Sequence, residues 1–558
     1  MSLSIAGLPA SRKTPGVNFA VVLGGPGTSS GAAPKSIMLL GNAVLTAITG
    51  SSPTLSVAAG TATTATVYPV PSTADALTLF GQGSELYRMA AAVFAQYPDA
   101  ALYACPVADA GGTAASGVLT FATTASAAYS VRLRMCGLTF DVAVASGDTA
   151  TVIAAAVADA INDNADLPYT AQNSSGVVTI TAKQTGPRGN TLIVDAYFVN
   201  GAGFETRITT SSTASPGATT GIWSATGTLG SEITLSNGAT QDSFALALAA
   251  IEPVRYDRIV GACIDSTNVG RIVTHVNTNA GPTVQLLEQA VIPSVDTYAN
   301  AVTLATGQNA SRLQVAWHFA SPLPAPDVAA QLAALRLNAD AAVGGARVGE
   351  ASDPAANLDG LDLATVVVQR VPADRPTPTE VEGALNNGLA VLAPSGSRPG
   401  YAALVRSVTS RSTASGVPNY AVIDTAYVTV TDYCADRYRS RLAADLAGAK
   451  LGADLPNGQP ASRAPNVTTP SIVRQLIVGY QKEDEEAGII RDVDANLPLL
   501  VVEADSGVSG RINCDIPVEP VTALHQTFGY VRQLAAAADA DRPGGRHLIH
   551  AAAGGVGL

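Results

Sequence analysis

Charged and aromatic side chains are scarce in this sequence. Of its 558 residues, 14% are charged and 5% are aromatic, and the formal net charge is -12 at pH 7. Average soluble proteins contain roughly 25% charged residues. Because a nucleic-acid-binding surface needs clustered basic residues, the acidic balance argues against nucleic acid as a partner. A sparsely charged surface is weakly solvated, and we therefore expect much of it to be covered by other subunits.

Long apolar runs are also missing. A membrane-spanning helix needs about 18 or more consecutive apolar residues. The nearest candidate, residues 37–48, contains Gly41 and Asn42. The first residues, MSLSIAGLPASRKTPG, place their basic side chains after a short apolar part, and no apolar signal core follows. We expect synthesis in the cytoplasm and no membrane insertion.

Cysteine is rare, and its spacing indicates no metal or redox motif. The five cysteines lie far apart and include no C-x-x-C pair. We expect them to be buried reduced thiols, with disulfides between subunits as the alternative. They are Cys105, Cys136, Cys263, Cys434 and Cys514.

Motifs for catalysis or cofactor binding are absent from the sequence. A glycine-rich stretch precedes Lys35 and Ser36, but Pro34 stands where a phosphate loop needs glycine. Only His547 and His550 among the histidines share a helix-like spacing. No nucleophile has a base near it in a recognisable pattern. We therefore predict a protein that is not an enzyme and has no cofactor and no metal.

The length and the periodicity of the chain predict several α/β domains, since 558 residues exceed what one hydrophobic core usually supports. Apolar residues at helical spacing predict a helix over residues 85–97, and AALYACPV follows it as a buried strand. YDRIVGACID and RLQVAWHF also read as strands, DVAAQLAALRLNADAAV as a helix, and TPTEVEGALNNGLAVL as a helix closed by Gly388 and followed by a strand. Alternation of this kind is typical of a mixed or parallel sheet covered by helices.

Residues 108–220 differ from the rest of the chain in composition, because they are rich in Thr, Ser, Ala and Gly. Five short segments alternate as strands do, and one helix, capped near Asp148 and Thr149, lies between the third and the fourth. The strand segments are SGVLTF, YSVRLRM, LTFDVAV, GVVTITA and NTLIVDAYFV. We interpret this part as an inserted β-rich module.

In the last third, AALVRSVTS and AVIDTAYVTV read as strands before a long helix, DYCADRYRSRLAADL. Thr469 and Pro470 are the cap and first residue of a further helix. NLPLLVVEAD, GRINCDIPV and HQTFGYVRQL are again strand-like, and an Ala/Gly tail follows. At the other end of the chain, NFAVVL reads as an isolated strand that must find its partners elsewhere.

Several of these segments, in this order, resemble the contractile tail sheath proteins of Mu-like myophages. The resemblance covers most of residues 1–107 and 220–534, and the inserted module resembles the additional outer domain of such sheaths. The Ala/Gly tail extends beyond the point where the family usually ends. The segments are IAGLPASRKTPGVNFAVV, YDRIVGACIDSTN, SRLQVAWHFASPLPAPDVAAQLAAL, LATVVVQRV, TPTEVEGALNNGLAVL, GVPNYAVIDTAYVTVTDYCADRYRSRL and TPSIVRQLIVGYQKEDEEAGII.

The resemblance implies an α/β multidomain fold, with a conserved sheath core of mixed α/β layers, an inserted β-rich outer domain and extended terminal arms. The implied domains are an N-terminal arm with a donated strand (1–24), the first part of the α/β sheath domain (25–107), the inserted outer domain (108–220), the second part of the sheath domain (221–430), a C-terminal inner domain with a terminal strand (431–534) and a flexible tail (535–558).

The function that the resemblance implies is that of a structural subunit of a contractile tail sheath. Such a sheath is a helical stack of hexameric rings around the tail tube, and it contracts to drive the tube through the host envelope. The implied partners are other copies of the chain, the tail tube protein, and the baseplate and tail terminator proteins. The implied location is the virion tail, assembled in the host cytoplasm.

Two sets of site residues follow from the resemblance. We expect one inter-subunit strand at each end of the chain, nominated within Asn18–Leu23 and Thr527–Leu534. Their residues are Asn18, Phe19, Ala20, Val21, Val22, Leu23, Phe528, Gly529, Tyr530 and Val531. The tube-facing candidates are Arg437, Arg439, Arg441 and Arg511, for which pairing with carboxylates of the same subunit is the alternative.

Two other functions remain open at this point. The sheath of a non-phage contractile injection system would have the same core. A β-rich surface adhesin would account for the Thr/Ser/Gly module, but it would not account for the Ala-rich helices of the last third.

Overall fold

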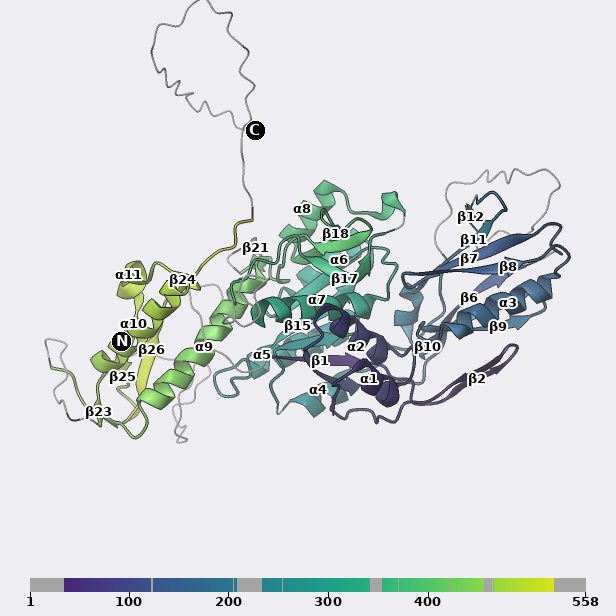
Figure 1. The fold of residues 1–558 in the computed structure, drawn as a ribbon. Helices are drawn as coiled ribbons and strands as arrows, with labels where there is room; N and C mark the ends of the chain where they lie inside the picture. The colour runs from purple at the N-terminus through teal and green to yellow at the C-terminus, as the bar shows by residue number, and fades with distance from the viewer. Residues whose placement is uncertain are drawn as a thin grey trace, which may run out of the picture. The chain divides into compact units, whose positions relative to one another are not determined.

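The computed structural model describes residues 35–525, with gaps at 122–123, 204, 208–232, 253, 342–353, 370, 421, 456–463 and 465. The chain divides into two units, Met1–Ala523 and Leu524–Leu558. The helices and strands described below belong to the first unit (Figure 1).

A nine-stranded sheet forms the centre of the α/β core. Its strand order is β17-β19-β18-β16-β15-β14-β1-β5-β4, and the six strands from β18 to β5 run parallel. The outer strands β4, β19 and β17 pair antiparallel. The strands are β1 (Ser36–Gly41), β4 (Tyr68–Pro69), β5 (Ala101–Pro106), β14 (Arg258–Gly261), β15 (Gln289–Ser294), β16 (Leu313–Trp317), β17 (Asp362–Val367), β18 (Leu389–Pro394) and β19 (Tyr401–Leu404).

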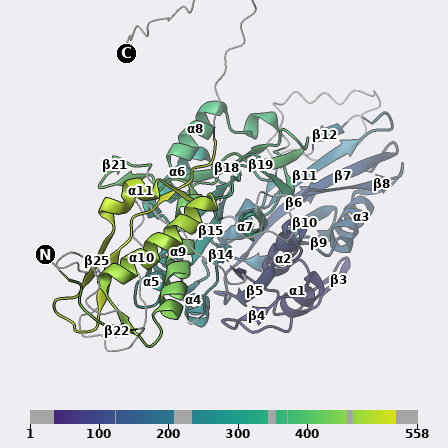
Figure 2. The same ribbon diagram turned by 60° about the vertical axis from the view of Figure 1, so that its left-hand side comes forward.

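Helices cover both faces of this sheet. The chain moves from β1 to β5 in one direction across the sheet and from β14 to β15 in the other, so right-handed crossovers place their helices on opposite faces. Helix α2 packs against α7 (Figure 2), and α5 packs against both α4 and α6. The helices are α1 (Thr73–Phe80), α2 (Glu85–Gln96), α4 (Ala245–Ile251), α5 (Ser266–Asn279), α6 (Tyr298–Gln308), α7 (Ala325–Ala341) and α8 (Pro378–Asn386).

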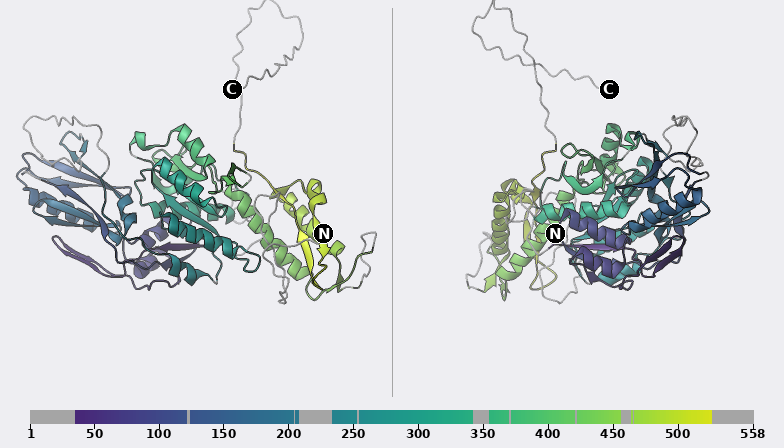
Figure 3. Two further views of the ribbon diagram at one scale, coloured as in Figure 1. Left: turned by 180° about the vertical axis from the view of Figure 1, so that it is seen from behind. Right: turned by 45° about the vertical axis from the view of Figure 1, so that its right-hand side comes forward.

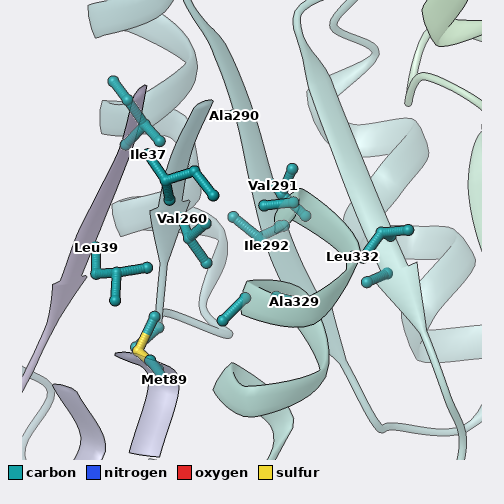
Figure 4. Packing of buried hydrophobic residues seen from close by; sticks show 14 of the residues in the cluster. Ile37, Leu39, Met89, Val260, Ala290, Val291, Ile292, Ala329 and Leu332 are labelled. Atoms are coloured by element: carbon teal, nitrogen blue, oxygen red, sulfur yellow. The ribbon is translucent and has the colours of Figure 1, made fainter. Parts of the chain in front are cut away.

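The main hydrophobic core lies between the sheet and these helices. Leu39 of β1 is aligned with Val260 of β14, and both are completely buried. Figure 4 shows them in one cluster with Met89 of α2 and with Leu332 of α7. Helix α7 is rich in alanine and leucine and is buried around almost its whole circumference, and polar side chains such as Gln331 and Arg336 are buried with it.

Residues 114–235, the β-rich segment, have a hydrophobic cluster of their own. One sheet has the order β6-β10-β9, and the other has the order β12-β11-β7-β8 with β13 also paired to β11. The strands are β6 (Ala114–Thr120), β7 (Tyr129–Met135), β8 (Leu138–Val144), β9 (Tyr169–Ser174), β10 (Val177–Thr185), β11 (Ile193–Val199), β12 (Glu205–Arg207) and β13 (Ile233–Thr234). Helix α3 (Ala150–Asp163) and the 3-10 helix η1 (Pro187–Thr191) complete the segment.

The described part of residues 425–523, the C-terminal region, contains helices and three small sheets. Helices α9 (Thr425–Asp445) and α10 (Pro470–Glu486) pack side by side (Figure 2 and Figure 3), and α11 (Val493–Asn496) is short. The sheets pair β22 (Lys450–Leu451) with β23 (Val467–Thr468), β24 (Ile490–Arg491) with β27 (Glu519–Pro520), and β25 (Val501–Ala504) with β26 (Ile512–Asp515).

Two further hairpins lie before this region. They pair β2 (Ile48–Ser51) with β3 (Thr54–Val57), and β20 (Thr413–Ala414) with β21 (Val417–Pro418). No helix in the described part of the chain is both long and apolar enough to cross a membrane.

The fold class is confirmed as mixed α/β with several domains. Thr149 caps α3 through its side chain, and α10 begins directly after Thr469, as predicted. Gly388 closes α8 with a φ of +80°, where a Cβ atom would lie 2.7 Å from the Ser410 backbone. The division into domains, the outer position of the β-rich module and the terminal arms stay predictions.

One strand prediction is wrong. The segment AVIDTAYVTV does not form a strand, because α9 begins at Thr425. Its β-branched residues favour a strand locally. The helix prevails because one of its faces docks on the core while another, including Val430, packs within the C-terminal region.

Several other predicted strands are shorter than expected. The strand predicted from AALVRSVTS ends at Leu404, and the one from NLPLLVVEAD begins only at Val501, after a 3-10 turn over Leu497–Leu499.

Candidate assembly surfaces

Helix α9 faces the α/β core with a stripe of polar side chains. Thr425, Thr429, Asp432 and Asp436 follow one another at spacings of four, three and four residues, which places them on one side of the helix. The Thr425 hydroxyl lies 2.6 Å from the Ser407 hydroxyl. The first three residues of the stripe are 3–5% exposed. The C-terminal region is thus joined to the core by a buried polar contact.

Arginines of the core complete this contact. The Arg312 guanidinium donates two hydrogen bonds to Asp432, of 2.8 and 2.6 Å. The Gln289 amide donates to the same carboxylate at 3.2 Å, and Arg255 pairs with Asp436. Burial raises the pKa of Asp436, and Arg255 opposes that shift. Because an unpaired buried charge is costly, each of these pairs depends on both partners.

Another side of α9 is apolar and belongs to the C-terminal region itself. Cys434, Tyr438 and Leu442 pack with Ile477 and Tyr480 of α10. The two tyrosine rings lie 5.9 Å apart, measured between their centroids. Helix α9 therefore has an apolar side that packs against α10 and a polar side that contacts the core.

The arginine candidates Arg437 and Arg441 are paired within the chain. Arg437 donates to Glu483 at 2.6 Å and also pairs with the fully buried Asp484. Arg441 binds Glu483 with two hydrogen bonds and lies over the Tyr480 ring, 4.4 Å from its centroid. The hydrogen bond from Arg441 and the positive charge of both arginines lower the pKa of Glu483.

The other two candidates are also paired. Arg439 donates to Asp436 at 2.8 Å and to the Gln285 side chain at 2.7 Å. Arg511 donates to Asp505 at 2.8 Å, and hydrogen bonds from Asn513 and Arg511 lower the pKa of that carboxyl. All four arginines thus make the intra-subunit pairs considered as the alternative, and contact with a tube stays a prediction.

Both nominated inter-subunit strands, Asn18–Leu23 and Thr527–Leu534, lie outside the described residues. The described part of the chain nevertheless contains a small sheet that a further strand could extend. Strands β25 and β26 form a two-stranded antiparallel sheet in which Val501 pairs with Asp515. Leu499, in the 3-10 turn before β25, is 52% exposed, and Val501, the first residue of β25, is 39% exposed.

The polar stripe of α9 is a feature that sequence reasoning missed. The signal was present, because Thr425, Thr429, Asp432 and Asp436 repeat at helical spacing. It was hidden because residues 421–430 were interpreted as a strand and the helix was expected to begin only at Asp432, so Thr425 and Thr429 were not placed on the same helix as the two aspartates.

The interior cysteines agree with the expectation of buried thiols. Cys105, Cys263 and Cys434 are buried, whereas Cys136 and Cys514 are half-buried, and no disulfide is formed within the chain. Burial raises the pKa of the Cys105 thiol to about 11, so it stays protonated at neutral pH. Among the described residues there is no group of three or more His, Cys, Asp or Glu side chains arranged to hold a metal ion.

The chain is similar to known proteins over most of its length. No protein-family model matches it. The Mu-like prophage FluMu tail sheath protein of Haemophilus influenzae is 24% identical over 461 residues, which are 82% of this chain and 86% of the relative.

Two solved structures are also similar. The sheath tail protein of Desulfitobacterium hafniense is 12% identical, with a TM-score of 0.44 over 88% of this chain and 94% of that one. The sheath tail protein of Listeria innocua is 13% identical, with a TM-score of 0.44 over 89% of this chain and 94% of that one. The relative from Haemophilus influenzae confirms the resemblance to Mu-like tail sheath proteins that the ordered sequence segments indicated.

Proposed function

We propose that the protein is the structural subunit of a contractile phage tail sheath. It polymerises as a helical stack of hexameric rings around the tail tube, and the stack contracts to drive the tube through the host envelope. The observation that carries this proposal is the similarity to a named tail sheath protein along 82% of the chain. The sparse charge supports it, because a subunit that is covered by neighbours needs few solvating side chains.

The proposed partners follow from this role. They are other copies of the chain, the tail tube protein, and the baseplate and tail terminator proteins. The subunit is made and assembled in the host cytoplasm and ends in the virion tail. Its interfaces are heterologous, which means that two different surfaces of the subunit meet. Contacts of this kind generate an open helix when their rotation does not close into a ring.

Strand donation is the proposed link between subunits. The sequence of residues 18–23 has a strand-like pattern and is followed by a stretch rich in glycine, so the proposed strand would pair outside its own neighbourhood. The β25–β26 sheet is the proposed acceptor, because a third strand at its edge would add backbone hydrogen bonds and cover apolar Leu499 and Val501. Backbone pairing tolerates sequence variation, which suits a link between many identical copies.

Sedimentation of a deletion variant tests this assembly. The full-length protein is expected to form large particles that grow with concentration. Deletion of residues 1–22 is expected to leave folded monomers, recognised by an unchanged far-ultraviolet circular dichroism spectrum and slow sedimentation. Deletion of residues 535–558 is the control, and it is expected to polymerise. Sheath-sized particles from the 1–22 deletion would contradict strand donation, while monomers from the full-length protein would contradict the sheath function itself.

A further inference from the structure

The hairpin β2–β3, residues 48–57, leaves the α/β core and contacts the β-rich segment; we call it the strap. Its root is fixed in the core, where the Val44 amide donates to the Phe80 carbonyl at 2.9 Å and the Gly60 amide donates to the Val44 carbonyl at 2.8 Å. Leu55 and Val57 on one face of the strap are buried in a small cluster with Val44. The tip of the strap lies beside β9, where it is hydrogen-bonded to Gln172.

The Gln172 side chain holds the tip of the strap. Its Oε1 accepts hydrogen bonds from the Ser51 and Ser52 amides, both at 3.0 Å. Its Nε2 donates to the Pro53 carbonyl at 3.1 Å, and the Asn173 amide donates to the Ser52 carbonyl at 2.6 Å. A single amide side chain thus satisfies three backbone groups of the turn.

Gly50 makes this arrangement possible. A Cβ atom at Gly50 would lie 2.4 Å from Nε2 of Gln172, which is too close for any side chain to be accommodated without displacing the amide. The backbone of Gly50 does not adopt a left-handed conformation. Glycine is therefore needed here for the close approach of Gln172 and not for backbone freedom.

A second attachment lies further along the same sheet. Lys183 of β10 donates from Nζ to the Ala165 carbonyl at 2.6 Å and, across to the core, to the Gln82 carbonyl at 3.1 Å. Asp166 accepts hydrogen bonds from the core residues Gln82 and Tyr87, at 3.0 and 2.9 Å. Burial lowers the pKa of Lys183 to about 8.

The third attachment is a buried charge cluster around Arg188 of η1. Its guanidinium donates to Glu85 at 3.1 Å, to Asp242 at 3.0 Å and to the Asn42 side chain at 2.7 Å. The Arg188, Glu85 and Asp242 side chains are at most 3% exposed. The Ala110 amide, in the strand-free stretch that leads into the β-rich segment, also donates to Asp242, at 2.7 Å. Charges buried so completely depend on this full set of partners.

The three attachments are spread along one sheet of the β-rich segment. Gln172 is aligned with Thr179 of β10, and Lys183 lies four residues further along that strand, roughly 13 Å away at the usual rise per residue. Arg188 follows β10 directly. A single attachment would let the β-rich segment rotate about one point, whereas attachments at separate points oppose that rotation.

We propose that the strap holds the β-rich segment to the α/β core through Gln172, whose side chain packs against Gly50. The attachments between these two parts of the fold then open only together. The strap acts within a single chain, and its role does not depend on the proposed sheath assembly. Gln172 is a positioning residue whose amide ties two parts of the fold.

Hydrogen–deuterium exchange on the full-length protein tests this proposal. In Gln172→Ala, strap amides at residues 48–57 are expected to exchange about tenfold faster, since two of them lose their acceptor. Because the attachments act together, exchange at residues 187–191 of η1 is expected to rise as well. Gly50→Ala is expected to give the same two changes by displacing the Gln172 amide.

Two control variants accompany the test. The Gln96 side chain of α2 also bridges two elements, because it is hydrogen-bonded to the backbone of Asp362 and Ala364 in β17. Both elements lie in the core, so Gln96→Ala is expected to leave strap exchange unchanged. Gly201→Ala adds a methyl group where nothing lies within 4 Å and is likewise expected to leave the strap unaffected. Unchanged strap exchange in both Gln172→Ala and Gly50→Ala would overturn the proposal. So would faster exchange confined to the strap with none at residues 187–191.

Discussion

Arg312 and Asp432 are joined by two buried hydrogen bonds although 120 residues separate them in the sequence. Their side chains are 3% and 7% exposed. Arg312 immediately precedes β16 and Asp432 lies on the polar stripe of α9, so this pair ties the C-terminal region to the central sheet. Removal of one partner leaves the other charge buried without compensation, which is strongly unfavourable.

Asp432→Asn is expected to destabilise the protein by about 3 to 5 kcal/mol, because Arg312 would remain buried without its counter-charge. Urea unfolding followed by circular dichroism measures the change. Asp141→Asn breaks the exposed pair with Arg132 and serves as the control, with a much smaller expected effect. Equal destabilisation by the two variants would contradict the importance of the buried pair.

Acidification is expected to destabilise the protein through His318. This side chain is completely enclosed, neither of its ring nitrogens has a hydrogen-bond partner, and burial lowers its pKa from 6.5 to about 4. Between these two values the unfolded chain binds a proton that the folded chain does not, so stability is full above pH 6.5 and falls as the pH drops towards 4.

The loss through His318 amounts to about 3 kcal/mol at the lower end of this range. His318→Leu is expected to flatten the dependence of the unfolding free energy on pH between 5 and 6.5. His525→Gln, which retains His318, should keep the slope of the unaltered protein. An undiminished slope in His318→Leu would rule out His318 as its source.

Truncation in the core is expected to depend strongly on position. Leu332→Ala removes a completely buried side chain of α7 and should cost about 2 to 5 kcal/mol through lost burial and the cavity left behind. Leu246→Ala, on α4, changes a side chain that is 66% exposed and is the matched control. Thermal unfolding of both variants provides the comparison, and a similar loss from each would contradict the placement of α7 in the core.

The start of α8 offers a local prediction. Thr377 accepts a hydrogen bond from the Glu380 amide, and Glu380 accepts one from the Thr377 amide, so each satisfies a free helix-end group. Thr377→Ala is expected to cost about 1 kcal/mol, whereas Thr377→Asn keeps the cap and should cost little. Urea unfolding distinguishes the two variants, and no difference between them would argue against the cap.

Much of the local structure could be predicted from the sequence, because caps and apolar spacing act over a few residues. The ends of α8 and α10 followed from Gly388, Thr469 and Pro470. The start of α9 could not, because the β-branched residues Val428 and Val430 favour a strand until tertiary packing decides otherwise. The strand order could not be predicted either, because both strands that pair with β1 lie more than sixty positions further along the chain.

The candidate sites show the same limit. Arg437, Arg439 and Arg441 were correctly placed on one helix. Their carboxylate partners include Glu483, over forty residues further along the chain, and only the packing of α9 on α10 brings these groups together. A sequence pattern shows which side chains share a helix face, but it does not show which distant residues that face meets.

Electron microscopy of the purified full-length protein in negative stain tests the sheath function most directly. The proposed subunit should form hollow cylinders of uniform width with regular transverse striations, because hexameric rings stack along one axis. Dispersed single particles, across the range of protein concentrations at which sheaths assemble, would contradict the account.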